Sequence, residues 1–156
     1  MLRFRLAIAA LLLASLCGLS SHLSARAIGD LNPKAITITL PADIKWTKSA
    51  TSERAVLYGD PSKPGYYVVL QKWLPHNNSR PHKHPNDRYI TVLSGTWWVN
   101  TGANYDPAGF KPVPAGSFVV HPANEFHYDG AKDEPALLQI SGMGPDTSTQ
   151  APAEAK

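Results

Sequence analysis

Residues 75 to 95 read PHNNSRPHKHPNDRYITVLSG, and this stretch decides the fold of the chain. His82 and His84 are two positions apart, and alternate side chains of a β-strand point to the same face. The two imidazoles are therefore expected side by side, about 6–7 Å apart along the strand. Two rings at this spacing can share one metal ion if a third ligand comes from elsewhere. The best candidate for that third ligand is His127.

The rest of the chain is a series of short, strand-like stretches separated by turn signals. Most of the 14 prolines and 11 glycines fall between these stretches, and no helical periodicity is evident. The pattern predicts an all-β sandwich or barrel of one domain. Strands are expected at residues 35–40, 44–46, 54–58, 66–73, 79–84, 88–93, 96–99, 116–122, 125–129 and 136–140.

The first 27 residues have the features of a secretory signal peptide. Two arginines precede an apolar run at 6–19, and Ala25-Arg26-Ala27 supplies small residues for cleavage. An uncleaved membrane anchor is the alternative, but the run is shorter than the ~20 residues that a spanning helix needs. The chain is therefore expected to be secreted, with the Gram-negative periplasm as the favoured compartment. The predicted organisation is a signal peptide at 1–27, a leader at 28–34, the folded domain at 35–145 and a disordered tail at 146–156.

The net charge argues against a nucleic-acid partner. The formal charge of +3 comes from 15 basic and 12 acidic residues, but three arginines and no acid lie in the signal. The mature chain therefore holds equal numbers of the two, without the clustered basic residues that bind phosphates. The single cysteine, Cys17, also leaves with the signal, so the mature domain has no disulfide.

Two motifs in this chain resemble those of the cupin superfamily. The first cupin motif is His-x-His, three or four residues, Glu, six residues and Gly; here it reads HKHPNDR at 82–88, then six residues and Gly95. The second is Gly, five residues, Pro-x-Gly, two residues and His; here it reads Gly116, five residues, and then PANEFH at 122–127. The resemblance implies a single cupin-type jelly-roll β-barrel, with the histidines of both motifs at a metal site.

The chain departs from these motifs at two positions. Asn124 replaces a glycine, which is a mild change because asparagine tolerates positive φ. Arg88 replaces the metal-binding glutamate, and a guanidinium cannot bind a cation. The implied ligand set is therefore His82, His84 and His127, for a divalent ion such as Fe, Zn, Mn or Ni. Some thiol and diketone dioxygenases of the superfamily resemble this three-histidine arrangement.

Arg88 has two alternative roles. If it points into the barrel, it adds positive charge beside the metal and is the candidate catalytic residue, because it can bind an anionic substrate oxygen. If it points outward, it pairs with Asp87 or another acid. The resemblance thus implies a dioxygenase, isomerase or hydrolase acting on a small anionic molecule. The alternatives are a non-catalytic cupin module that binds a small or sugar-like ligand, with or without metal, and a structural role.

Further expectations concern the faces of the strands. Residues 90, 92, 118 and 120 (Ile, Val, Phe and Val) are expected to line the barrel with Arg88, and Tyr89 to lie on the opposite face. His121 is expected to pack at a strand end rather than bind metal. The adjacent Trp97 and Trp98 must point to opposite faces, one into the core. Cupin relatives are commonly dimers, so a homodimer is a further prediction.

Overall fold

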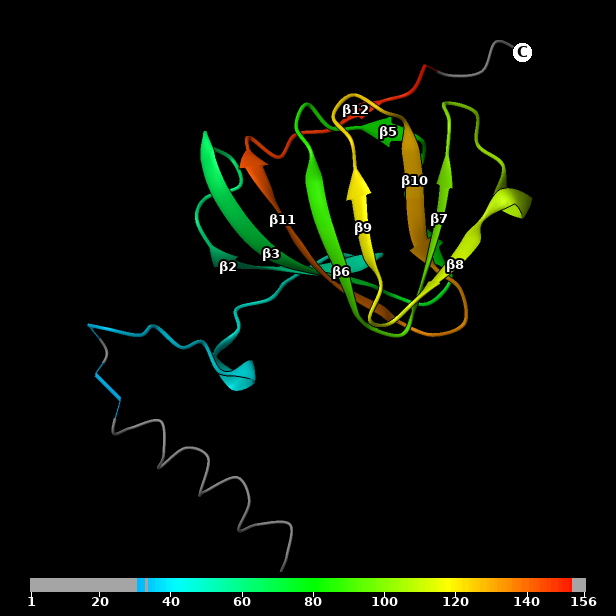
Figure 1. Ribbon diagram of the computed structural model, residues 1–156. Coiled ribbons are helices and arrows are strands. Elements are labelled where there is room, and N and C mark those ends of the chain that lie inside the picture. Colours follow the sequence, from blue (N-terminus) through cyan, green and yellow to red (C-terminus); the bar gives the residue numbers. More distant parts are fainter. Residues whose placement is uncertain (1–30, 33, 153–156) are drawn as a thin grey trace, which may run out of the picture. The chain divides into compact units, whose positions relative to one another are not determined.

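The computed structural model describes residues 31, 32 and 34–152 (Figure 1). The predicted signal peptide, part of the leader and the last four residues of the predicted tail lie outside this range. The chain divides into two units, residues 1–39 and 40–156, and the sheets belong to the second. Among the described residues, no helix has the length and hydropathy that a membrane span requires.

Two antiparallel sheets make up the second unit and face each other (Figure 1). The first has the strand order β1 (Thr47–Lys48), β2 (Ser52–Tyr58), β3 (Gly65–Trp73), β11 (Ala136–Gly144), β6 (Arg88–Ser94) and β9 (Phe118–His121). The second has the order β12 (Thr149–Gln150), β5 (His82–Lys83), β10 (His127–Ala131), β7 (Thr96–Thr101) and β8 (Lys111–Pro114), and β4 (Asn77–Asn78) also pairs with β10. Two short 3₁₀ helices, η1 (Pro41–Asp43) and η2 (Pro107–Gly109), complete the elements.

The core lies between the two sheets and is built from alternate residues of the long strands. Strand β11 pairs with β3 on one side and with β6 on the other, so three long strands form the centre of the first sheet. Trp97 of β7 is fully buried against them. The predicted all-β architecture is therefore confirmed. The buried apolar cluster consists of Tyr67, Val69, Ile90, Val92, Trp97, Ala131, Ala136, Leu138 and Ile140.

The strand predicted at residues 35–40 is wrong. The backbone there forms a turn in which the Asn32 carbonyl accepts from the amides of Ala35 and Ile36. Residues 36–40 do not pair with another strand of the described structure. Alternating β-branched residues favour extended backbone, but a strand exists only where a neighbouring strand supplies hydrogen-bond partners. Strand β8 (Lys111–Pro114), by contrast, lies where the sequence predicted no strand.

The lining of the barrel was predicted correctly on β6 and wrongly on β9. Ile90 and Val92 are buried, as expected, but Phe118 is 65% and Val120 42% exposed. In the ladder, Ile90 lies opposite Val119. Residues directly opposite each other share a face, so Val119 faces inward and its neighbours face outward.

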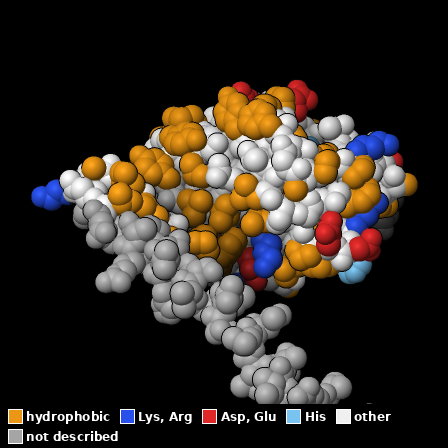
Figure 2. Space-filling view, turned by 60° about the horizontal axis from the view of Figure 1, so that its bottom comes forward, with side chains coloured by type: hydrophobic (Ala, Val, Ile, Leu, Met, Phe, Trp, Pro, Cys, Tyr) orange, Lys and Arg blue, Asp and Glu red, His pale blue; other side chains and the backbone are white. Residues whose placement is uncertain are grey.

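The predicted opposition of adjacent side chains is confirmed at two places. Trp97 is buried while Trp98 is partly exposed beneath the ammonium of Lys132, 3.6 Å from its ring centroid. Tyr89 is exposed while Arg88 is buried. On the face drawn in Figure 2, the described lysine and arginine side chains are scattered and form no continuous basic patch, and hydrophobic side chains are exposed between them.

The prediction of a disordered tail from Asp146 onward is wrong for the residues that the structure describes. Strand β12 pairs with β5, with Gln150 opposite His82 and Thr149 opposite Lys83. The Ala151 amide donates to the Pro81 carbonyl at 2.9 Å. We call residues 145–151 the C-terminal strap. Its small, polar composition is typical of disorder, but its backbone groups find partners along the motif segment.

Candidate metal centre

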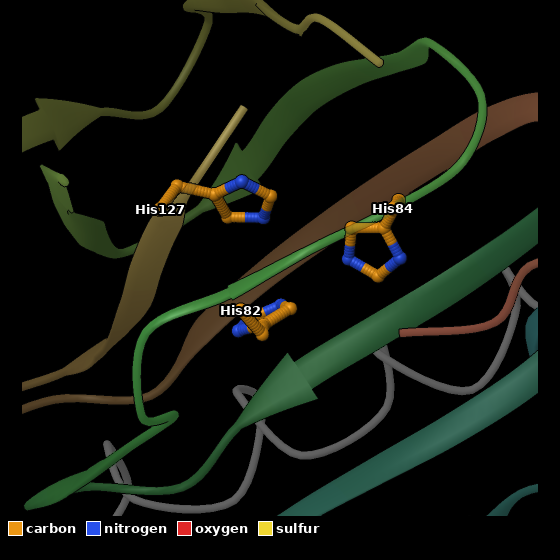
Figure 3. A group of neighbouring side chains, drawn as sticks. All are labelled: His82, His84 and His127. Atoms are coloured by element: carbon orange, nitrogen blue, oxygen red, sulfur yellow. The ribbon is translucent and has the colours of Figure 1, made fainter. Parts of the chain in front are cut away.

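The structure brings the three predicted ligands together. His82 lies on β5, His84 follows directly after it, and His127 begins β10 opposite His82. The ring centroid of His82 is 4.9 Å from that of His84 and 4.6 Å from that of His127, and the last two are 5.3 Å apart. One ring nitrogen from each lies within 4.8 Å of the other two. Figure 3 shows the three side chains converging from the two segments.

Backbone carbonyls orient all three rings. The Nδ1 atom of His82 is 2.8 Å from the Arg80 carbonyl, that of His84 is 2.8 Å from the Thr147 carbonyl, and that of His127 is 3.1 Å from the Glu125 carbonyl. A carbonyl can only accept, so each Nδ1 carries the proton and each Nε2 keeps its lone pair. This is the arrangement that fixes metal-binding histidines in proteins.

The donor set suits a divalent metal. The Nε2 atom of His127 is buried and, within the described part of the chain, has no hydrogen-bond partner. Such an orphaned acceptor is costly unless a ligand satisfies it. Burial is the main cause that lowers the pKa of His84 and of His127 to about 4, so both rings are neutral at pH 7. These two neutral imidazoles can therefore bind a cation without first losing protons.

Acid is expected to destabilise the metal-free protein between pH 6.5 and pH 4. Histidines of the unfolded chain titrate near pH 6.5, whereas the folded pKa of His84 and His127 is about 4. The unfolded state therefore binds more protons in this window. The free energy of unfolding therefore decreases as the pH is lowered through this window, by up to about 1.4 kcal/mol per pH unit for each ring. Melting curves in EDTA at pH 7 and pH 4.5 measure the effect, and equal melting temperatures would contradict it.

Arg88 points into the barrel and is only 8% exposed, so the outward alternative is wrong. Its Nη1 atom contacts the Nε2 atom of His84. The Asp87 carboxylate instead accepts from the Ala123 amide at 2.7 Å. A guanidinium has no lone pair, so Arg88 donates and His84 accepts. Arg88 thus occupies the lone pair that His84 would offer to a metal.

An acid that the sequence did not reveal lies behind Arg88. The Oδ1 atom of Asp146 is 3.6 Å from Nε of Arg88 and 3.5 Å from Nδ1 of His84, and its Oδ2 atom pairs with Nη2 of Arg54. Burial alone would raise the pKa of Asp146, but the two arginines hold it below its usual value. No sequence signal marks this carboxylate, because its ion pair with Arg54 joins residues 92 positions apart.

A second buried acid, Asp129, anchors the floor of the site. Its Oδ2 atom accepts from the indole N–H of Trp73 at 3.0 Å and of Trp97 at 2.9 Å, and its Oδ1 atom accepts from the Ser79 hydroxyl at 3.2 Å. His121 lies between this group and the metal candidates, with its ring 3.8 Å from that of His127. Its ring also packs 5.4 Å from Trp97, which fits the predicted packing role.

Asn124 performs the backbone role of the motif glycine. Its φ is +65°, in the left-handed region that asparagine tolerates better than most residues. Its amide donates to the carbonyl of His84 at 2.8 Å. The turn that precedes His127 is thereby tied to the segment that carries the other two histidines.

Comparison with solved structures agrees with this architecture, although no family model and no curated protein matches the sequence. The polyketide cyclase RemF from Streptomyces resistomycificus aligns with a TM-score of 0.62 and 14% identity, over 76% of this chain and 87% of that one. The DMSP lyase DddQ from Ruegeria pomeroyi aligns with a TM-score of 0.59 and 13% identity, over 90% and 96%. A cupin-2 domain from Rhodospirillum rubrum aligns with a TM-score of 0.57 and 17% identity, over 76% and 81%.

This chain has a jelly-roll barrel fold like that of the solved cupin-2 domain. The two motif segments occupy facing positions in it, and their histidines meet inside the barrel. At these low identities the likeness concerns the fold alone.

Proposed function

We propose that this chain is an exported cupin that binds one divalent metal ion through His82, His84 and His127. One observation carries the proposal: three buried imidazoles, each held at Nδ1 by a backbone carbonyl, present ring nitrogens within 4.8 Å of one another. When bound, such an ion supplies Lewis acidity to an oxygen of the ligand. The charge and geometry of the site favour a small anionic molecule as that ligand.

Arg88 is the residue we assign to this anion. Its guanidinium is buried beside the three rings and can donate two parallel hydrogen bonds to a carboxylate or enolate oxygen pair. Burial of all three histidines keeps bulk water from the ligand. The fold admits several reactions of this class, because the neighbours include a cyclase and a lyase. Oxygen insertion, isomerisation and hydrolysis are the candidates.

Metal analysis of the untagged mature chain tests the proposal. We expect close to one ion of Fe, Zn, Mn or Ni per chain by mass spectrometry, and a lower melting temperature after EDTA treatment. At a free metal concentration of 100 Kd the bound state is more stable by about 2.7 kcal/mol, a shift of several degrees. Absence of metal, together with an unchanged melting temperature when each of the four ions is added, would contradict it.

A non-catalytic binding module is the second candidate function. It is favoured by the contact between Arg88 and Nε2 of His84, because this contact satisfies one ligand atom without a metal. In that case the barrel holds a small anionic or sugar-like ligand on Arg88 alone. A chain that binds no metal yet is stabilised by small carboxylates or sugars in a thermal-shift screen would support this alternative.

Export and assembly complete the proposal. The features of residues 1–27 support export to the periplasm, and N-terminal sequencing of the protein from the periplasmic fraction tests cleavage after Ala27. The homodimer stays a prediction, which light scattering of the mature chain can test. The balanced charge of the mature chain supports the absence of a nucleic-acid partner.

A further inference from the structure

The guanidinium of Arg88 lies between two acceptors and is only partly satisfied by them. Its Nη1 atom contacts Nε2 of His84, while its Nε atom has no hydrogen-bond partner in the described structure. The Oδ1 atom of Asp146, 3.6 Å from that Nε, is also buried and lacks a partner there. A buried donor and a buried acceptor therefore face each other just beyond hydrogen-bond distance.

We propose that Asp146 is a positioning residue that draws Arg88 away from His84 when a metal ion binds. This inference rests on the proposed function. Arg88 and a metal ion cannot share the one lone pair on Nε2 of His84. Metal binding therefore requires Arg88 to release His84, and a released guanidinium needs a partner because an unpaired buried charge is costly. The Oδ1 atom of Asp146 is that partner, reached by a shift of less than about 1 Å.

The C-terminal strap holds Asp146 in place for this exchange, in which Arg88 changes its partner from His84 to Asp146. The amide of Asp146 donates to the Pro61 carbonyl, and Arg54 binds its Oδ2 atom, so Oδ1 is the carboxylate oxygen that has no hydrogen-bond partner among the described residues. One residue later, the carbonyl of Thr147 orients His84. The strap thus contacts both members of the Arg88–His84 pair, although it lies outside the two motifs.

Charge balance supports the same exchange. A divalent ion beside a guanidinium would be repelled, and in a buried site this repulsion is screened little. An aspartate behind the arginine offsets this repulsion, as the motif glutamate would if it occupied position 88. In the structure, Arg88 therefore lies between this carboxylate and His84, one of the candidate metal ligands.

A double-mutant cycle with zinc tests the proposal. The Kd for Zn²⁺ is measured by isothermal titration calorimetry for the mature chain, D146N, R88M and D146N/R88M. D146N is expected to weaken binding about 10–100-fold, the range seen for residues that support metal ligands. R88M, which removes the competing donor, is expected to tighten binding. In the R88M background the effect of D146N should fall to about threefold or less, because no guanidinium then needs a partner.

The outcomes separate the two proposals. If the unmutated chain binds neither zinc nor any of the other three candidate ions, the proposed function fails. If it binds zinc but D146N has the same effect with and without Arg88, or R88M weakens binding, the exchange is wrong. D133N, which changes an exposed acid, is the matched control and should leave the Kd unchanged. If D146N fails to fold in a thermal melt, the R88M variant still tests the exchange: tighter zinc binding supports it, and weaker binding contradicts it.

Discussion

Replacing His127 with alanine is expected to reduce metal affinity by more than 100-fold, beyond the 10–100-fold range of supporting residues. His127 is the only one of the three ligands on the second motif, and its Nε2 atom is a buried acceptor without a hydrogen-bond partner in the described structure. Two histidines alone do not complete the set of three protein ligands found in open metal sites. The measurement is the Kd for Zn²⁺ by calorimetry, with the metal content of the purified variant as a second readout.

The control for this variant is His76→Ala, which removes an exposed histidine. It should leave both the Kd and the metal content unchanged. The metal-free H127A protein should keep a cooperative melt, because the apolar cluster between the sheets does not include His127. Near-normal zinc binding by H127A would mean that the three rings do not form the site.

Replacing Asp129 with alanine is expected to lower the free energy of unfolding by about 2–5 kcal/mol, because each donor left without an acceptor costs about 1–3 kcal/mol. The carboxylate accepts hydrogen bonds from Trp73, Trp97 and Ser79, which come from three different segments. Without it, the indole N–H groups of the buried Trp97 and the partly buried Trp73 lose their acceptor. Asp129 lies on β10, whose first residue is His127, so its hydrogen bonds also fix the strand that carries this candidate ligand.

Urea unfolding in EDTA measures this loss without a metal contribution. Trp73→Phe removes only one of the donors and should cost less than D129A. Asp133→Ala changes an exposed acid of the neighbouring turn and should stay within about 0.5 kcal/mol of the unmutated chain. If D129A were as stable as D133A, Asp129 would not anchor the floor of the site.

Much of the fold was predictable because its signals are local. Strands β2, β3, β6, β7 and β11 each contain a stretch of alternating or continuous apolar residues bounded by proline or glycine. The His-x-His pair depends only on the two-residue period of a strand. The assignment of faces on β9 failed because the sequence there, Phe-Val-Val, is apolar on both faces. Pairing with β6 decided which residues point inward.

The sequence by itself determined an all-β chain with two histidine motifs and an arginine in place of the motif glutamate. These features reside in residue types and short spacings, which do not depend on the rest of the chain. Only the tertiary structure decided the partners of Arg88. Its contact with His84 depends on an inward rotamer, and its acid, Asp146, lies on the C-terminal strap, which pairs with β5. The Arg88–Asp146 contact joins residues far apart in the chain, and the four-residue spacing of His84 and Arg88 does not set the rotamer, so no local pattern predicts either contact.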